Sequence, residues 1–219
     1  MARRAVAVAG RAVAGVAGLL LAATACSGSG EQAPAPDPAA LRACQEVFGS
    51  ESVGALRAAL GDGFRPHGPA GADVKGRLVA EARQWRAGTD DLRRQVQHPC
   101  EIEGGGSGRV ITATVGWSMY DIDHVSSGKG RFRWRTVADG VYVASRPDIW
   151  GTPLVMPCTV PGTAPGQGRE LPLEVAVLHK ATGEAAEVPE ERLLAGLARG
   201  TRELLGCREQ LGVPDDLLP

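Results

Sequence analysis

The chain has 219 residues, and its 24 basic and 25 acidic side chains give a formal net charge of −1 at pH 7. The first 25 residues hold three arginines and no acidic residue, so the rest of the chain carries about −4. This balance argues against nucleic acid as the main partner, because phosphate backbones are bound by basic surfaces. After residue 25 no hydrophobic run is long enough to cross a membrane.

The N-terminal segment is typical of an export signal. Arginines precede an apolar run over residues 12–23, which is too short to span a bilayer but has the length of a signal-peptide core. Residues 20–26, LLAATAC, resemble the lipobox of bacterial lipoproteins. In that family the cysteine thiol receives a diacylglyceryl group, the chain is cut before the cysteine, and the new amino group can receive an acyl chain such as palmitate. The resemblance implies a signal peptide over residues 1–25 and a lipidated Cys26.

The same segment leaves alternatives open. Ala23 stands where the usual lipobox has a larger aliphatic residue, and Ala23-x-Ala25 also fits an ordinary cleavage site that would leave Cys26 as a free thiol. The Arg3-Arg4 pair permits twin-arginine export as well as the general secretory route. Together with the arginine-rich composition, the signal resembles that of an actinobacterial lipoprotein. This resemblance covers the export segment and does not extend to the domain that follows.

A tether is expected to join Cys26 to a folded domain. Residues 27–38 are small, polar and proline-rich, and such a segment spans roughly 20 Å as a flexible chain. We therefore divide the chain into a signal peptide, a lipidated cysteine with its tether over residues 26–38, and a single extracytoplasmic domain over residues 39–219. The length of that last part suits one domain with a substantial core.

Helices are expected at the start of this domain. Asp37 can cap a helix over residues 38–48, and Pro38 suits its first turn. A second short helix is expected to stop at Gly61. A third, over residues 73–87, has an apolar stripe at helical spacing made of Val74, Leu78, Ala82 and Trp85.

The middle of the chain predicts antiparallel strands. Residues 100–103 and 109–118 read as a hairpin, and alternation in its second strand places one set of side chains in the core: Ile111, Ala113, Val115 and Trp117. Residues 131–137 and 141–145 flank an Asp-Gly pair, which is a strong turn signal.

The C-terminal third is expected to begin with a long Pro/Gly loop over residues 146–168. A strand over residues 171–178 and a helix over residues 189–205 follow, and Gly206 is expected to stop the helix. The order of elements predicts an α+β fold, in which the N-terminal helices and a C-terminal helix pack on one face of an antiparallel sheet.

The five cysteines support the lipoprotein interpretation. An odd count in an exported protein leaves one thiol over, whereas acylation of Cys26 leaves four that can form two disulfides in an oxidising compartment. Four cysteines allow three pairings. We favour Cys44–Cys100 and Cys158–Cys207, because each ties a helix to a β segment or long loop and the two do not cross. No C-x-x-C pair is present, so the spacing gives no zinc or redox signature, and no cofactor is expected.

Two segments are candidates for chemistry. Asp121, Asp123 and His124 could bind a divalent cation from a loop, although an extended strand would point His124 away from the carboxylates. We interpret this segment as a solvated turn between strands, with a metal site as the weaker alternative.

The second segment is Arg131-Phe-Arg-Trp-Arg135. As a strand it would present Arg131, Arg133 and Arg135 on one face, where they could bind phosphates of an envelope polymer or lipid headgroups. The alternative, which we favour, is an ordinary amphipathic strand with Phe132 and Trp134 in the core.

No nucleophile–base pair and no phosphate-binding motif is recognisable in the sequence. We therefore expect a lipoprotein held on the extracytoplasmic face of the cell membrane by its lipid, acting as a non-enzymatic module that binds an envelope protein, polymer or small ligand. Two alternatives remain: an enzyme acting on cell-wall or lipid substrates, and an accessory subunit of a transporter or envelope complex.

Overall fold

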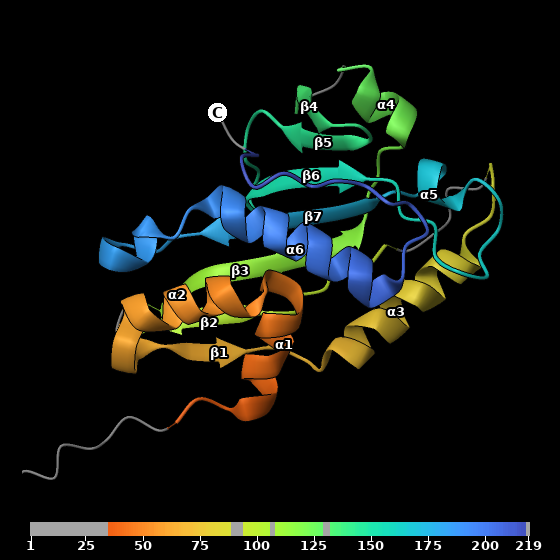
Figure 1. Cartoon of the computed structure of the whole chain (residues 1–219). Helices are drawn as coiled ribbons and strands as arrows, with labels where there is room; N and C mark the ends of the chain where they lie inside the picture. Colours follow the sequence, from red (N-terminus) through yellow and green to blue (C-terminus); the bar gives the residue numbers. More distant parts are fainter. Residues whose placement is uncertain (1–34, 89–93, 106–107, 129–131, 218–219) are drawn as a thin grey trace, which may run out of the picture. The chain divides into compact units, whose positions relative to one another are not determined.

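The fold is built on one seven-stranded antiparallel sheet with the strand order β1-β2-β3-β7-β6-β5-β4 (Figure 1). The computed structural model describes residues 35–88, 94–105, 108–128 and 132–217. The strands are β1 (Arg65–His67), β2 (Glu101–Gly104), β3 (Gly108–Trp117), β4 (Trp134–Ala138), β5 (Val141–Ala144), β6 (Thr152–Met156) and β7 (Leu173–His179).

Helices occur before, between and after the strands. The longer helices are α1 (Pro38–Phe48), α2 (Ser50–Leu60), α3 (Gly71–Gln84) and α6 (Glu190–Leu205). The shorter ones are α4 (Ile122–Ser126), α5 (Gln167–Glu170) and the 3-10 turns η1 (Gly61–Gly63) and η2 (Gly183–Glu187). In the described part of the chain no helix has the length and apolar character needed to cross a membrane. The predicted α+β class is confirmed.

The helix boundaries follow the capping signals in the sequence. The Asp37 side chain accepts a hydrogen bond from the Ala39 amide at 2.9 Å, and Pro38 occupies the first turn of α1. At the other end of the domain, Gly206 takes the left-handed conformation that closes α6. Both expected boundaries are confirmed.

The main core lies between the sheet and the four longer helices. The predicted inward set of β3 is confirmed, because Ile111, Ala113, Val115 and Trp117 are all buried in this core. They meet apolar side chains from α1, α2, α3 and α6, and from the neighbouring strands. In Figure 1 the long helix α6 runs across the sheet beside β7. We name this side of the sheet the helix-covered face.

Two disulfides belong to this core. Cys44 of α1 bonds to Cys100, just before β2, and Cys158, just after β6, bonds to Cys207 at the end of α6. The favoured pairing is therefore confirmed. Each bond ties a helix of the helix-covered face to the sheet.

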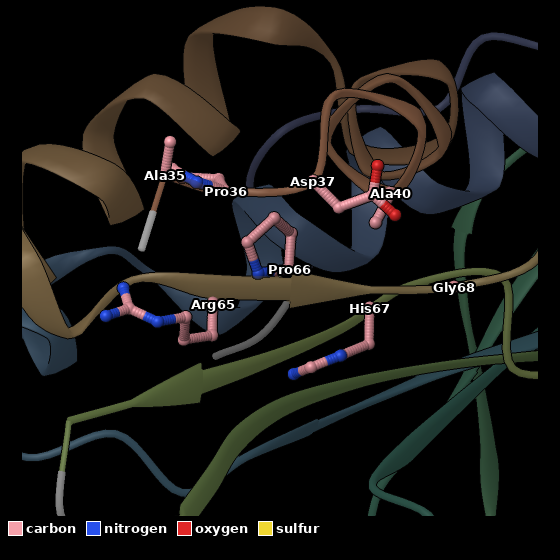
Figure 2. Close-up of a pocket in the computed structure, with 8 residues that line it drawn as sticks. All are labelled: Ala35, Pro36, Asp37, Ala40, Arg65, Pro66, His67 and Gly68. Carbon is pink, nitrogen blue, oxygen red and sulfur yellow. The ribbon is translucent and has the colours of Figure 1, made fainter. Parts of the chain in front are cut away.

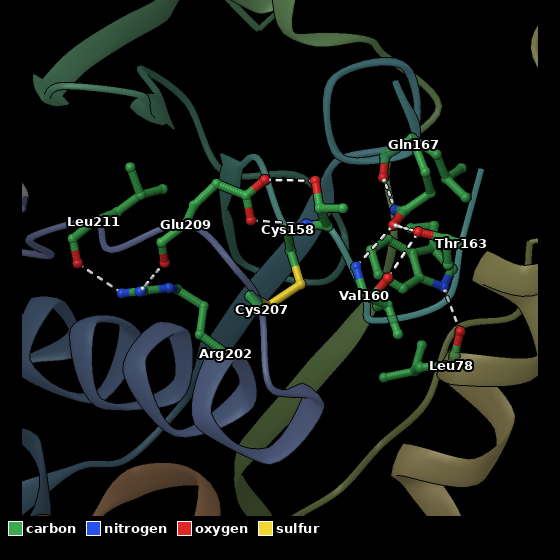
Figure 3. Close-up of a disulfide and its surroundings, with 12 residues drawn as sticks. Leu78, Cys158, Val160, Thr163, Gln167, Arg202, Cys207, Glu209 and Leu211 are labelled. Carbon is green, nitrogen blue, oxygen red and sulfur yellow. Dashed lines mark hydrogen bonds between the residues drawn. A yellow bond between two sulfur atoms is a disulfide. The ribbon is translucent and has the colours of Figure 1, made fainter. Parts of the chain in front are cut away.

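Around the second disulfide a polar network fixes the chain that follows β6 (Figure 3). The fully buried Gln167 accepts a hydrogen bond from the Val160 amide at 2.9 Å and donates one to the Leu171 carbonyl at 3.0 Å. The Glu209 carboxylate accepts from the Thr159 amide at 2.7 Å. These bonds satisfy backbone groups that an irregular buried segment would otherwise leave unpaired.

One predicted element was wrong. The segment over residues 146–168 is not a continuous loop, because it contains β6, a central strand paired with both β5 and β7. All five residues of β6 are buried. A strand covered on both faces lacks the alternation of polar and apolar residues by which strands are recognised. Pro153 is a further signal against a central strand at this position.

Candidate functional site

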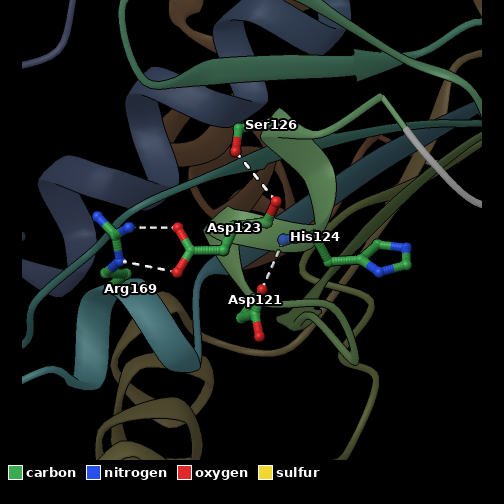
Figure 4. A network of polar contacts seen from close by, with 5 residues as sticks. All are labelled: Asp121, Asp123, His124, Ser126 and Arg169. Atoms are coloured by element: carbon green, nitrogen blue, oxygen red, sulfur yellow. Dashed lines mark hydrogen bonds and ion pairs between the residues drawn. The ribbon is translucent and has the colours of Figure 1, made fainter.

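The segment over residues 121–124 is not a turn but the start of helix α4 (Figure 4). Asp121 caps this helix by accepting a hydrogen bond from the His124 amide at 2.6 Å. Asp123 forms an ion pair with Arg169 of α5, and the His124 ring stacks on Tyr120 at 4.7 Å between centroids. The three side chains thus serve separate contacts and do not converge. Among the described residues no group of three or more His, Cys, Asp or Glu side chains could hold a metal ion.

The arginine row is interrupted. Arg131 lies outside the described residues, and β4 begins only at Trp134. Arg133 has a positive φ of 48°, which breaks the alternation that would place it beside Arg135. Arg135 instead donates a hydrogen bond to the Leu217 carbonyl. The predicted strand over residues 131–137 therefore starts too early, and anion binding by these arginines stays a prediction.

Two surface cavities are lined by polar side chains that already form contacts within the fold. One, of about 320 Å³, lies between the start of α1 and the edge strand β1 (Figure 2). Its polar side chains already have partners: Asp37 caps α1, Arg65 donates to the Asp62 carbonyl, and His67 lies 3.4 Å from Glu103.

The other cavity, of about 510 Å³, lies between α6 and the α1–α2 pair. Both arginines on its lining are already paired, Arg192 with Glu51 and Arg199 with Asp215, each at 2.7 Å. Neither cavity gathers side chains that suggest a reaction.

A third region has a different character: the face of the sheet opposite the longer helices, which we name the second face. Register places Gly116 of β3, Glu174 of β7, Val155 of β6 and Tyr142 of β5 in one row across this face. At the β4–β6 end, α4 covers it with a small separate core made of Ile122, Val125, Trp134, Ala144 and Val155. The part built by β3 and β7 lies beyond that cover.

Glu174 is the central residue of this part. Its neighbour on one side is Gly116, which has no side chain, and on the other side Val155, which is fully buried. Burial raises the pKa of the Glu174 carboxyl, the hydrogen bond from Ser118 lowers it, and the negative charge of Asp148 raises it further. Burial is the largest of these three influences, so a partly buried carboxyl lies on an otherwise apolar strand.

Asp148 belongs to the connection between β5 and β6. Its carboxylate accepts a hydrogen bond from the Trp150 amide at 2.7 Å, and its backbone pairs with Gly151. A Cβ at Gly151 would lie 1.8 Å from the Val177 carbonyl oxygen, so glycine is required where this connection meets β7. The connection is thereby fixed beside Glu174.

Trp150 extends this site towards β2. Its ring lies 5.5 Å from the ring of His98. Gln97, the preceding residue, pairs with Val115 and accepts a hydrogen bond from Arg77 of α3, so Gln97 lies on the helix-covered face. Alternation then places His98 on the second face, with Trp150 against it.

Exposed large apolar residues occur in the chain segments that border Glu174. In the described chain the exposed large hydrophobic residues are Val96, Met119, Ile149 and Trp150, with exposed fractions of 50%, 78%, 79% and 41%. Val96 lies next to Gly116, Met119 follows Ser118, and the other two follow Asp148. The four exposed apolar residues thus belong to three segments, distant in the sequence, that each border the Glu174 site.

No protein-family model, curated protein sequence or solved structure matches this chain. The site is therefore interpreted from its own geometry.

Sequence reasoning missed Ser118, Asp148 and Glu174. Two signals were available: Glu174 is a single acid within the apolar strand LEVAVL, and Ile149-Trp150 is an apolar pair within a Pro/Gly segment. Neither signal shows that these residues meet, because the strand β6 that separates them was not recognised.

Proposed function

We propose that this protein is a lipid-anchored binding module of the bacterial cell envelope, which holds a partner molecule on the second face of its sheet. Its location is proposed from the lipobox resemblance at Cys26 and the signal-like segment before it. The observation that supports binding is the partly buried Glu174 carboxyl, bordered by segments that carry the exposed large apolar residues of the described chain.

The exposed apolar side chains and the Glu174 carboxyl each carry a free-energy cost in the unliganded protein. Large apolar side chains at the surface order water around them, and exposed apolar groupings are typical of interaction sites. A carboxylate held away from water loses hydration that one hydroxyl cannot replace. A molecule that covers the apolar residues and bonds to the carboxylate relieves both costs at once.

An enzyme acting on envelope polymers is the second candidate, and the pair of carboxyls favours it. A carboxyl with a raised pKa can act as a proton donor, and glycoside hydrolysis uses a pair of carboxyl groups. Sustained turnover of an envelope polymer, lost in Glu174→Gln, would establish this function in place of simple binding.

The direct test of the binding function is native mass spectrometry of the full chain isolated from the membrane fraction of its host. We expect a mass that begins at Cys26 with added acyl chains, an increase on reduction that matches two disulfides, and a retained adduct. A chain without acyl groups would contradict the anchor, and a chain without any adduct would contradict the binding function.

Variants locate the adduct. Ile149→Ser and Met119→Ser each remove an exposed apolar side chain of the second face, and we expect both to lower the occupancy of the adduct. Arg57→Ser, in an exposed position on α2, is the matched control and should retain it. Equal loss in all three variants, or in none, would place the adduct elsewhere.

A further inference from the structure

Among the described residues, the charged side chain that shifts the pKa of Glu174 is an acid, Asp148. The influences on its carboxyl are burial, the Ser118 hydroxyl and the Asp148 carboxylate, and no basic side chain is among them. Three other acidic groups on the described surface pair with arginines, in the Arg169–Asp123, Arg192–Glu51 and Arg199–Asp215 pairs. Two carboxylates held together without a cation favour an incoming positive charge.

A second polar group on the same face lacks a hydrogen-bond partner. Thr114 is 8% exposed, and its hydroxyl oxygen is buried without a hydrogen-bond partner. Ala113 and Val115 lie in the main core, so alternation turns Thr114 to the second face, two residues from Gly116 and paired with Ala176. A buried hydroxyl without a partner is uncommon in folded proteins, and it offers an acceptor beside Glu174.

Trp150 supplies the third component. Its backbone amide bonds to Asp148, and its ring lies against His98 on the same face while 41% of the residue is exposed. The face of an indole attracts cations, and its area accommodates an apolar chain. Ile149, next to Trp150 in the chain, and Met119, next to Ser118, are the most exposed large apolar residues of the described chain.

We propose that this site binds a protonated primary amine carried on an apolar group. The ammonium, which has three N–H donors and no acceptor, donates to the carboxylates of Glu174 and Asp148 and to the Thr114 hydroxyl. Its apolar substituent lies on Trp150 and Ile149. This inference rests on the proposed binding function and adds the chemical class of the ligand.

The test uses the full chain and three probes of the same length: n-hexylammonium, n-hexanol and n-hexanoate. Trp150 is the reporter, because Trp85, Trp117 and Trp134 are buried, with exposed fractions of 4%, 4% and 8%. We expect a saturable change in tryptophan emission with n-hexylammonium. The two other probes should bind at least about tenfold more weakly, since a charged hydrogen bond contributes at least that factor.

Substitutions that keep the size of a side chain then test how much its charge contributes to n-hexylammonium binding. Glu174→Gln keeps the size of the side chain and should weaken n-hexylammonium binding at least about tenfold, as should Asp148→Asn to a smaller extent. Thr114→Val tests the hydroxyl. Glu103→Gln, which neutralises an exposed carboxylate on β2, is the control and should bind as the unaltered protein does. The thermal unfolding midpoint of each variant verifies that it is folded.

The outcomes distinguish this inference from the function on which it rests. Equal binding of n-hexanol and n-hexylammonium, or unchanged binding in folded Glu174→Gln, overturns the amine inference and leaves an apolar binding face. Failure of all three probes also overturns it. The proposed binding function is tested separately, because it fails if the protein from its host membrane carries no adduct.

Discussion

The two faces of the sheet differ in how they are stabilised. On the helix-covered face, fully buried aliphatic side chains from five strands meet four helices, and both disulfides lie there. On the second face, the part around Glu174 has a carboxyl held from water, a hydroxyl without a partner and exposed apolar residues. One face therefore stabilises the domain, whereas the other contains groups that cost free energy in the absence of a ligand.

The difference between the two faces can be tested within a single segment, since Ile149 and Leu154 lie only five residues apart. Leu154 is fully buried in the main core, whereas Ile149 is 79% exposed beside the second face. We expect Leu154→Ala to lower the free energy of unfolding by about 2–5 kcal/mol, because it leaves a cavity. Ile149→Ala should change it by less than about 0.5 kcal/mol. Denaturant titration of both variants measures the difference, and similar losses would contradict the division into two faces.

The close packing of α6 on α1 predicts a second, smaller change in stability on the helix-covered face. A Cβ at Gly200 of α6 would lie 2.5 Å from the Val47 carbonyl oxygen of α1, so Gly200→Ala should cost about 1–3 kcal/mol through overpacking. Gly54 of α2 has open space around it, and Gly54→Ala should instead stabilise the domain by about 0.5–1 kcal/mol. Thermal unfolding of the two variants should therefore shift in opposite directions. Equal shifts would show that α1 and α6 do not meet at Gly200.

The smallest change in stability is expected for the substitution of Glu174. Ionisation of this carboxyl should destabilise the folded protein, which is the opposite of what is expected for an ordinary surface carboxylate. Burial and Asp148 raise the pKa of Glu174 above its ordinary value of 4.5, so the folded state holds the proton more tightly than the unfolded chain does. Stability due to this group is therefore lost as pH rises from 4.5 through the raised pKa. Glu174→Gln, which cannot ionise, should be more stable than the unaltered protein at neutral pH.

Unfolding curves at several pH values test this sign. The gain in Glu174→Gln should be present at pH 7, should shrink as the pH falls from the raised pKa towards 4.5, and should be gone below 4.5, where Glu174 is protonated in both states. Glu103→Gln is again the control. A variant that is less stable at neutral pH would mean that Glu174 contributes to the stability of the second face rather than opposing it.

Much of the helix-covered side could be predicted from the sequence because its signals are local. Asp37 and Pro38 mark the start of α1, Gly206 marks the end of α6, and the alternation of β3 identifies its buried side chains. The disulfide pairing followed from the same elements, since a pairing that does not cross requires no knowledge of the sheet order.

The second face could not be predicted because its signals are not local. β6 reads as part of a loop, since Val155 is covered by α4 while Leu154 and Met156 face the main core, and no polar residue alternates with them. Asp121 and Arg133 have roles that depend on a helix start and on a positive φ, and neither is evident from composition. The meeting of Asp148 with Glu174 depends on strand order, which periodicity does not give.

The two disulfides have a further consequence for the order in which the chain is oxidised. Within residues 44–207 each bond joins a cysteine to the next one along the chain, so an oxidant that links thiols as they appear produces the native pairs without reshuffling. Cys26 precedes both pairs, and as a free thiol it would be the first available partner for Cys44. The thioether expected at Cys26 removes that competitor, so on this view lipid attachment protects the fidelity of oxidation as well as anchoring the chain.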